Sequence, residues 1–107
     1  MSSTVLWAHK EIIIGNNVKI GGNCTIIDTD SHSLDYLKRR SASADWGVAK
    51  PVVIEDDVML GMNTIVLKGV TIGARTIVGA GSVVTKTLPP DCIAAGNPAK
   101  VVKYINA

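Results

Sequence analysis

An aliphatic residue recurs at every sixth position of this chain over two long stretches. A period of six fits neither the 3.6-residue turn of an α-helix nor the two-residue alternation of a simple strand. A short fixed period indicates a solenoid, and a six-residue period is typical of a parallel β-helix built from stacked coils. The repeated positions are Ile14, Ile20 and Ile26 in the first stretch, and Ile54, Leu60, Val66, Ile72, Val78 and Val84 in the second.

The other positions of the hexad support this interpretation. With the repeated aliphatic as position one, position five holds mostly small or medium side chains, as a second and narrower inward site requires. Position four is rich in Asn, Asp and Gly, which tolerate a positive φ and therefore suit a turn. Three hexads close one triangular coil, and stacking buries the interior that a single coil leaves open. The position-four residues are Asn17, Asn23, Thr29, Asp57, Asn63, Gly69, Arg75, Gly81 and Thr87.

The two repeat blocks are out of phase with each other. The separation between Ile26 and Ile54 is not a multiple of six. A weak hexad that starts at Val48, with Val52 inward, leaves an excursion at about residues 32–47. This segment is polar and charged, and a long loop that interrupts a solenoid is more often functional than accidental. We therefore expect the functional site to involve it.

The repeat ends after Val84. Pro89 and Pro90 stop strand pairing, and the Gly-Asn-Pro sequence at 96–98 marks a turn. Residues 100–105 are predicted to form a short strand or helical turn that caps the stack. The expected fold class is therefore all-β, with one domain over residues 1–107.

Composition narrows the functional classes. The chain has no apolar run long enough to cross a membrane as a helix and no signal-peptide pattern at its start, so a cytoplasmic protein without membrane contact is the default expectation. A net charge of +2 and the lack of Phe argue against nucleic-acid binding. Cys24 and Cys92 are expected to be reduced and structural, because their spacing fits no disulfide framework or metal motif.

Four sequence strings carry a family resemblance. IIIGNNVKIGGNCTIIDTDSH, IEDDVMLGMNTIVLKGVTIG, VGAGSVVTK and AAGNPAKVV occur in this order and cover nearly the whole chain. Together they resemble the hexapeptide-repeat acyltransferases, in particular the maltose, galactoside and capsular-sugar O-acetyltransferases. The resemblance implies a left-handed parallel β-helix, a hand that the period alone does not predict. It also implies a homotrimer with active sites between subunits and transfer of acetyl from acetyl-CoA to a sugar-like acceptor.

His32 is the main candidate for catalysis. It follows the third hexad directly, where the chain leaves the coil, and it matches the histidine that acts as general base in the family. Imidazole titrates near neutral pH, so it can take the proton of a hydroxyl that attacks a thioester. The alternative is a surface histidine hydrogen-bonded to the backbone.

Two carboxylates precede this histidine. Asp28 or Asp30 could hold the second imidazole nitrogen and fix the tautomer. Alternatively, both are turn residues that accept hydrogen bonds from backbone amides. Asp30 falls at an inward hexad position, so it must be paired or the coil must open there.

The resemblance also places the acetyl-CoA site. Lysine ammonium groups suit the phosphates of coenzyme A, although a solvated basic surface is the alternative. Backbone groups at Met62 and Ala80 match contacts to the pantetheine arm. The cofactor-binding residues implied by the resemblance are Met62, Ala80, Thr85, Lys86, Lys100 and Lys103.

Two departures from the family pattern leave alternatives open. Met59 stands where Trp is common, and family members have a longer N-terminal part, so this chain is expected to be a C-terminal portion or to have a reduced acceptor site. One alternative is a binding or assembly module without catalysis. The other is a metalloenzyme of the γ-class carbonic anhydrase kind, which needs three protein ligands for zinc. No metal is expected, because the chain has only two histidines, His9 and His32.

Overall fold

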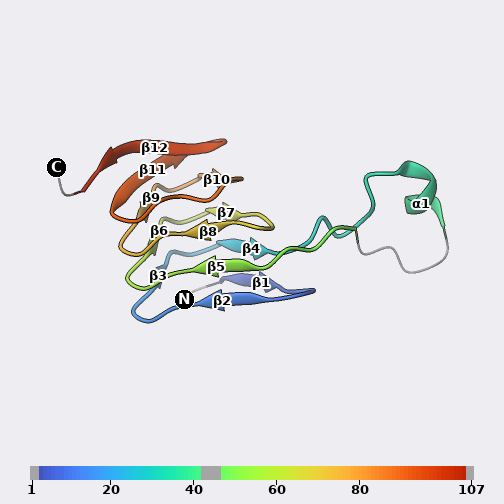
Figure 1. Ribbon diagram of the computed structural model, residues 1–107, viewed down its shortest axis with the longest axis horizontal. Helices are drawn as coiled ribbons and strands as arrows, with labels where there is room; N and C mark the ends of the chain where they lie inside the picture. Colours follow the sequence, from blue (N-terminus) through green and yellow to red (C-terminus); the bar gives the residue numbers. More distant parts are fainter. Residues whose placement is uncertain (1–2, 42–46, 106–107) are drawn as a thin grey trace.

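The computed structural model describes residues 3–41 and 47–105, which form a stack of triangular coils with one long arm (Figure 1). Most strands are two or three residues long, because each hexad leaves room for little more before the next turn. The elements are β1 (Val5–Trp7), β2 (Ile12–Ile14), β3 (Lys19–Ile20), β4 (Thr25–Ile27), α1 (Tyr36–Arg40), β5 (Val52–Ile54), β6 (Met59–Leu60), β7 (Ile65–Val66), β8 (Thr71–Ile72), β9 (Ile77–Val78), β10 (Val83–Val84), β11 (Cys92–Gly96) and β12 (Ala99–Tyr104).

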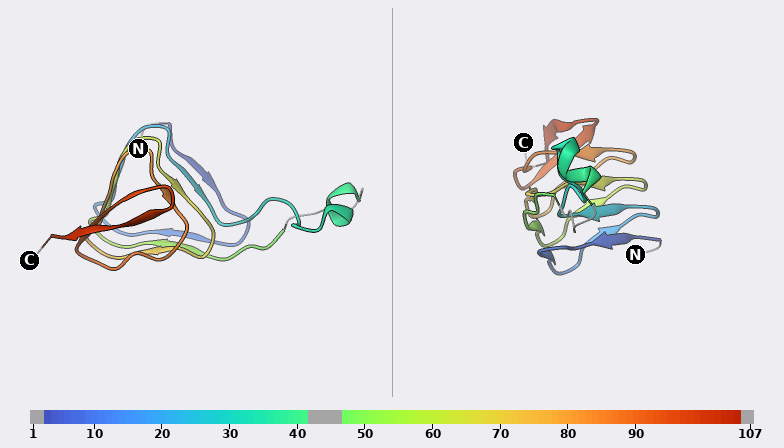
Figure 2. Two further views of the ribbon diagram at one scale, coloured as in Figure 1. Left: turned by 90° about the horizontal axis from the view of Figure 1, so that it is seen from above. Right: turned by 90° about the vertical axis from the view of Figure 1, so that its right-hand side faces the viewer.

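Three sheets form the faces of the triangle. Sheet I contains β2, β5 and β8; sheet II contains β3, β6, β9, β11 and β12; and sheet III contains β1, β4, β7 and β10. The chain visits sheets I, II and III in turn. Seen from above in Figure 2, with the C-terminal end nearest the viewer, it runs clockwise as it rises. A clockwise path toward the viewer is a left-handed coil, so the predicted left-handed parallel β-helix is confirmed.

The strand register measures the length of each coil. Ile65 pairs with Val83, which lies three hexads farther along the chain, as the repeat predicts. Across the arm the step is more than twice as long, because Thr25 pairs with Ile65. The arm therefore inserts more residues than a whole coil contains without disturbing the pairing above or below it. Its position is close to that of the predicted excursion.

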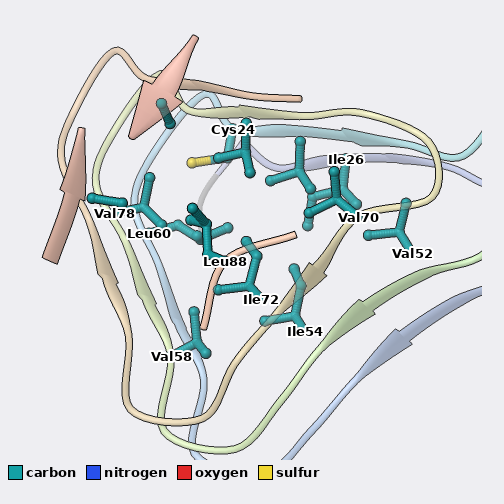
Figure 3. Close-up of a cluster of buried hydrophobic side chains, with 14 of the residues drawn as sticks. Cys24, Ile26, Val52, Ile54, Val58, Leu60, Val70, Ile72, Val78 and Leu88 are labelled. Atoms are coloured by element: carbon teal, nitrogen blue, oxygen red, sulfur yellow. The ribbon is translucent and has the colours of Figure 1, made fainter. Parts of the chain in front are cut away.

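The core is a column of aliphatic side chains along the axis of the stack (Figure 3). Every repeated aliphatic is buried except Ile14, which is partly buried in the open first coil. Each buried side chain contributes roughly 1.5–3 kcal/mol before chain entropy is subtracted. Polar members of position five also lie inside, because their hydroxyls donate to backbone carbonyls: Thr64 Oγ1 to Gly61 O at 2.7 Å and Ser82 Oγ to Gly79 O at 2.6 Å.

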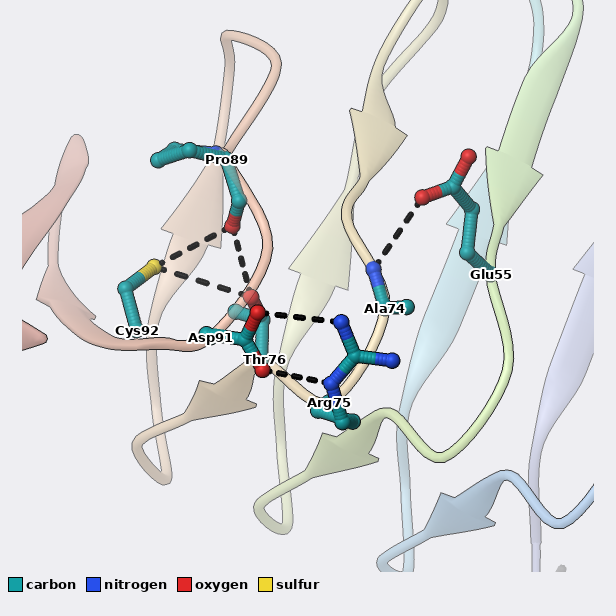
Figure 4. Close-up of polar contacts among 7 residues, drawn as sticks. All are labelled: Glu55, Ala74, Arg75, Thr76, Pro89, Asp91 and Cys92. Atoms are coloured by element: carbon teal, nitrogen blue, oxygen red, sulfur yellow. Dashed lines mark hydrogen bonds and ion pairs between the residues drawn. The ribbon is translucent and has the colours of Figure 1, made fainter. Parts of the chain in front are cut away.

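The turns have the predicted backbone conformation. The Asn, Asp and Gly residues at position four all have a positive φ, and so does Arg75 at 64°. The arginine's guanidinium binds both carboxylate oxygens of Asp91, with Nη2 3.0 Å from Oδ2 (Figure 4). This ion pair links the last full coil to the segment that leads into β11. Arg75, a non-glycine residue with a positive φ, therefore has a side-chain partner in a distant segment.

A β-hairpin covers the C-terminal end of the stack. β11 continues sheet II in parallel with β9, and β12 returns antiparallel to it. The cap predicted over residues 100–105 is present, and of the two predicted forms, a short strand or a helical turn, it is the strand, Ala99–Tyr104. At the opposite end, the first coil leaves Val5, Leu6 and Trp7 exposed.

The arm contains a short helix that the hexad pattern did not predict. Asp35 caps α1 by accepting a hydrogen bond from Leu37 N at 2.9 Å, and basic residues fill the last turn. Both features stabilise a helix end, and Asp35 before an aliphatic and basic run was a usable signal. No residue of α1 is buried, so its own caps and turns stabilise it within this chain.

Truncating one side chain of the core should destabilise the protein strongly. Ile54→Ala should lower the free energy of unfolding by about 2–5 kcal/mol, because Ile54 is fully buried. The matched control is Ile13→Ala in the same sheet, where 47% exposure should keep the loss within about 1 kcal/mol. Urea unfolding followed by circular dichroism measures both. Equal losses would contradict the assignment of inward and outward positions.

Candidate functional site

The arm leaves the body through a two-stranded neck at the corner where sheet III turns into sheet I, here called the arm corner. The outgoing residues 28–30 pair with the returning residues 48–50. Asp30 N donates to Val48 O at 3.0 Å, and Lys50 N donates to Asp28 O at 2.8 Å. Between them Thr29 and Ala49 form an antiparallel bridge. These bonds fix the direction in which the arm departs.

His32 lies just beyond this neck, and it is exposed at the surface. Its carbonyl group faces Gly47 on the returning segment, where a Cβ would collide with the His32 oxygen. Gly47 also has a φ of 68°, so the close approach requires glycine on two grounds. The backbone of His32 is therefore placed by both segments of the arm, as a functional side chain on a loop requires.

Asp30 is tied to the next coil. Its carboxylate lies 2.9 Å from Lys68 Nζ, and both side chains are partly exposed. The inward position predicted for Asp30 required either a partner or an opening of the coil. The structure has both, because the chain leaves the stack here. Lys68 was not identified from the sequence, since nothing in the period relates it to the neck.

Asp28 is completely buried and accepts three backbone hydrogen bonds. Oδ1 accepts from His9 N at 2.7 Å, and Oδ2 accepts from Lys10 N at 2.6 Å and Glu11 N at 2.7 Å. Burial alone would raise the pKa of Asp28, but the three N–H donors, helped by the charge of His9, hold it below its usual range. Both carboxylate oxygens accept hydrogen bonds from backbone amides, which agrees with the alternative that Asp28 is a turn residue.

All but one of the residues expected to bind the cofactor fall into two groups. Met62 and Ala80 occupy equivalent positions in successive coils, where sheet II turns into sheet III; Gly81 N donates to Met62 O at 2.8 Å. The turn of the β11–β12 hairpin lies at this corner, here called the hairpin corner, because Gly96 N donates to Ser82 Oγ at 3.2 Å. Lys100 pairs with Ala95 nearby.

The second group lies above the neck. Thr85 and Lys86 are exposed and follow β10 at the arm corner, two coils above His32. Lys103 belongs to neither group, because it lies opposite Ile93 near the start of β11. Within one chain, therefore, the candidate base lies at the arm corner, whereas Met62 and Ala80 lie at the hairpin corner.

A shallow groove of about 330 Å³ lies elsewhere, on sheet I. No residue of the predicted site lines it. Its walls are Ile13, Gly15, Val53, Ile54, Glu55, Asp56 and Ala74.

The structure also bears on the expectations about metal sites, membrane spans, Tyr36 and the cysteines. Within residues 3–41 and 47–105, no three His, Cys, Asp or Glu side chains gather as a metal site needs. Over the same ranges no helix is long and apolar enough to span a membrane. Tyr36 is exposed on α1, and Arg40 Cζ lies 5.4 Å from the centre of its ring. Both cysteines are buried and free, and Cys92 lies at the start of β11.

Comparison with known proteins gives consistent matches. Residues 51–86 match the family model described as bacterial transferase hexapeptide (six repeats). The galactoside O-acetyltransferase of Lactococcus lactis is 43% identical over 90% of this chain and 44% of its own length. The chain thus spans about half the length of the curated relatives it matches.

Two solved structures share the fold. A hexapeptide-repeat acetyltransferase from Vibrio cholerae, complexed with acetyl coenzyme A, has a TM-score of 0.87 and 40% identity, covering 98% of this chain and 55% of that chain. A maltose O-acetyltransferase from Clostridium difficile has a TM-score of 0.78 and 30% identity, covering 97% of this chain and 67% of that chain.

The buried Asp28 carboxylate should make stability depend on acid pH. Its lowered folded-state pKa means that its stabilisation is fully present above the unfolded-state pKa of about 3.9 and is lost as the pH falls toward the folded-state pKa. Asp28→Asn should therefore be less stable than the wild type at pH 7, with the difference shrinking below about pH 4. Urea unfolding between pH 7 and pH 3 measures this. A difference that stays constant across the range would contradict the assignment.

Proposed function

This chain belongs to the hexapeptide-repeat acetyltransferase family, and we propose that it transfers an acetyl group from acetyl-CoA to a hydroxyl of a small, sugar-like acceptor. The observation that carries the proposal is the position of His32. It lies at the outer end of a hydrogen-bonded neck, near the surface, with its backbone held against Gly47. The similarity to galactoside and maltose O-acetyltransferases supports the choice of donor and acceptor class.

In the proposed reaction, His32 acts as general base. Its neutral imidazole takes the proton of the acceptor hydroxyl while the oxygen attacks the carbonyl carbon of the acetyl thioester. The tetrahedral intermediate collapses by breaking the C–S bond, and the imidazolium returns the proton to the sulfur of coenzyme A. The acetyl ester and free coenzyme A are the products.

The groups proposed to bind the cofactor lie in the coils that follow the arm and in the C-terminal hairpin. Lys100 and Lys103 present ammonium groups on β12 for phosphate oxygens, and Lys86 does so at the arm corner. The backbone at Met62 and Ala80 would contact the pantetheine arm. Thr85 lies beside Lys86, at the end of β10.

A homotrimer would bring His32 of one protomer close to the hairpin-corner residues of another. His32 and the hairpin corner lie at different corners of one triangular coil, so a site that needs both requires a second copy. Threefold closure would bring the arm corner of each protomer to the hairpin corner of its neighbour and use each of these two corners once. The arm carries exposed Leu34 (82%) and Leu37 (59%), apolar surface that suits a partner contact.

Removing the imidazole should abolish most of the activity. His32→Ala should lower kcat by about 10²–10⁴-fold, because general-base catalysis typically contributes that much. His9→Ala is the matched control; it keeps the backbone N–H that binds Asp28 and should retain kcat. Release of coenzyme A from acetyl-CoA in the presence of a panel of sugars, followed with a thiol reagent, measures both. Full turnover in His32→Ala would exclude it as the base.

Acetyl-CoA binding should depend on the lysines of β12. Lys100→Ala should weaken binding by about tenfold or more, because a hydrogen bond to a charged group contributes roughly 1.5–3 kcal/mol. Lys19→Ala is the control, an exposed lysine at the opposite end of the same sheet. Isothermal titration calorimetry measures the dissociation constants. If neither acetyl-CoA nor coenzyme A binds the wild type at millimolar ligand, the acetyltransferase proposal fails and the non-catalytic binding module is favoured.

A further inference from the structure

We propose that Asp28 is a positioning residue that anchors the arm to the first coil and thereby sets the place of His32. The inference rests on the proposed role of His32 and assigns Asp28 a task different from a catalytic dyad. Both oxygens of its carboxylate accept hydrogen bonds from backbone N–H groups, at His9, Lys10 and Glu11. Asp28 therefore acts on the fold and not on the reacting atoms.

Three segments of the chain meet at Asp28. Its side chain holds the turn at residues 9–11 of the first coil. Its own N–H donates to Trp7 O at 3.2 Å in β1, and its carbonyl accepts from Lys50 N at 2.8 Å on the returning side of the neck. One residue thus ties the coil below the arm to both segments of the neck.

The anchor matters because the neck begins here. β4 ends at Ile27, and Asp28 is the first residue that leaves the strand ladder. The next two residues pair with Ala49 and Val48, and His32 lies farther out along the same segment. A shift at Asp28 therefore moves the base, and a displacement of about 1 Å can lower a rate by a hundredfold.

Only a carboxylate at this position satisfies all three donors. Asparagine offers one acceptor oxygen and a donor NH₂ group, so at least one of the three amides would face another donor. In a fully buried site such a mismatch disrupts the local structure. This accounts for an acidic residue at a fully buried position.

The experiment compares Asp28→Ala and Asp28→Asn with Asp56→Ala in the full chain. Asp56 provides a matched control, because its Oδ1 accepts a single backbone bond from Asn16 N at 2.7 Å at an exposed corner away from the arm. Hydrogen exchange measures the neck amides of Asp30 and Lys50 against Gly61 and Gly79 in remote coils. Kinetics with acetyl-CoA and an accepted sugar give kcat and KM separately.

In both Asp28 variants the neck amides should exchange about ten- to hundredfold faster, with remote amides unchanged. The kcat should fall about tenfold or more while KM for acetyl-CoA stays within about twofold. The loss should disappear in a His32→Ala background, because Asp28 acts through His32. Asp56→Ala should change neither the neck amides nor kcat.

Unchanged exchange at the neck in both Asp28 variants would overturn the inference, whatever the activity. Faster exchange with unaltered kcat would also overturn it, because the arm would then be loosened without effect on the base. An equal loss of kcat in the His32→Ala background would show that Asp28 acts elsewhere. If the wild type is inactive with every acceptor, the proposed function fails, whereas the exchange measurement still decides whether Asp28 anchors the arm.

Discussion

The register between successive coils is the constraint on which the rest of this structure depends. A two-residue strand has no partner within its own coil, so its backbone groups bond to the coil above or below. Gly61 N donates to Val78 O and Gly79 N to Ala94 O, both at 2.8 Å. The same three-hexad step places each aliphatic above the last, so hydrogen bonding and core packing are satisfied by one repeat.

This constraint also determines where the stack accepts an insertion. Within a strand, an added residue would shift every side chain to the opposite face. At a corner, the chain can leave and return if its two ends meet again, as residues 28–30 and 48–50 do through their own pairing. The neck therefore combines a rigid origin, set by Asp28 and the ion pair of Asp30 with Lys68, with a projecting arm that carries His32.

Particular residues show how far the sequence could predict this arrangement. The hexad identified Ile26, Ile54 and Val66 as core residues and the phase shift identified the arm, because both depend on local spacing. It did not distinguish Asp28 from Asp30. The hexad placed Asp30 inward, whereas Asp28 is the buried carboxylate and Asp30 pairs with Lys68 near the surface. Local spacing does not reveal these partners, because they come from the coils below and above the neck.

The sequence by itself determined the solenoid, its core column, its turns and the point of interruption, since each follows from a six-residue pattern of side-chain size and backbone tolerance. Only the tertiary structure decided which groups meet across coils. It committed the Asp28 carboxylate to three amides, and it placed His32 and the Met62–Ala80 pair at different corners. Those outcomes depend on the stacking of distant segments. A local repeat specifies the stack, but it does not specify which side chains interact at each corner.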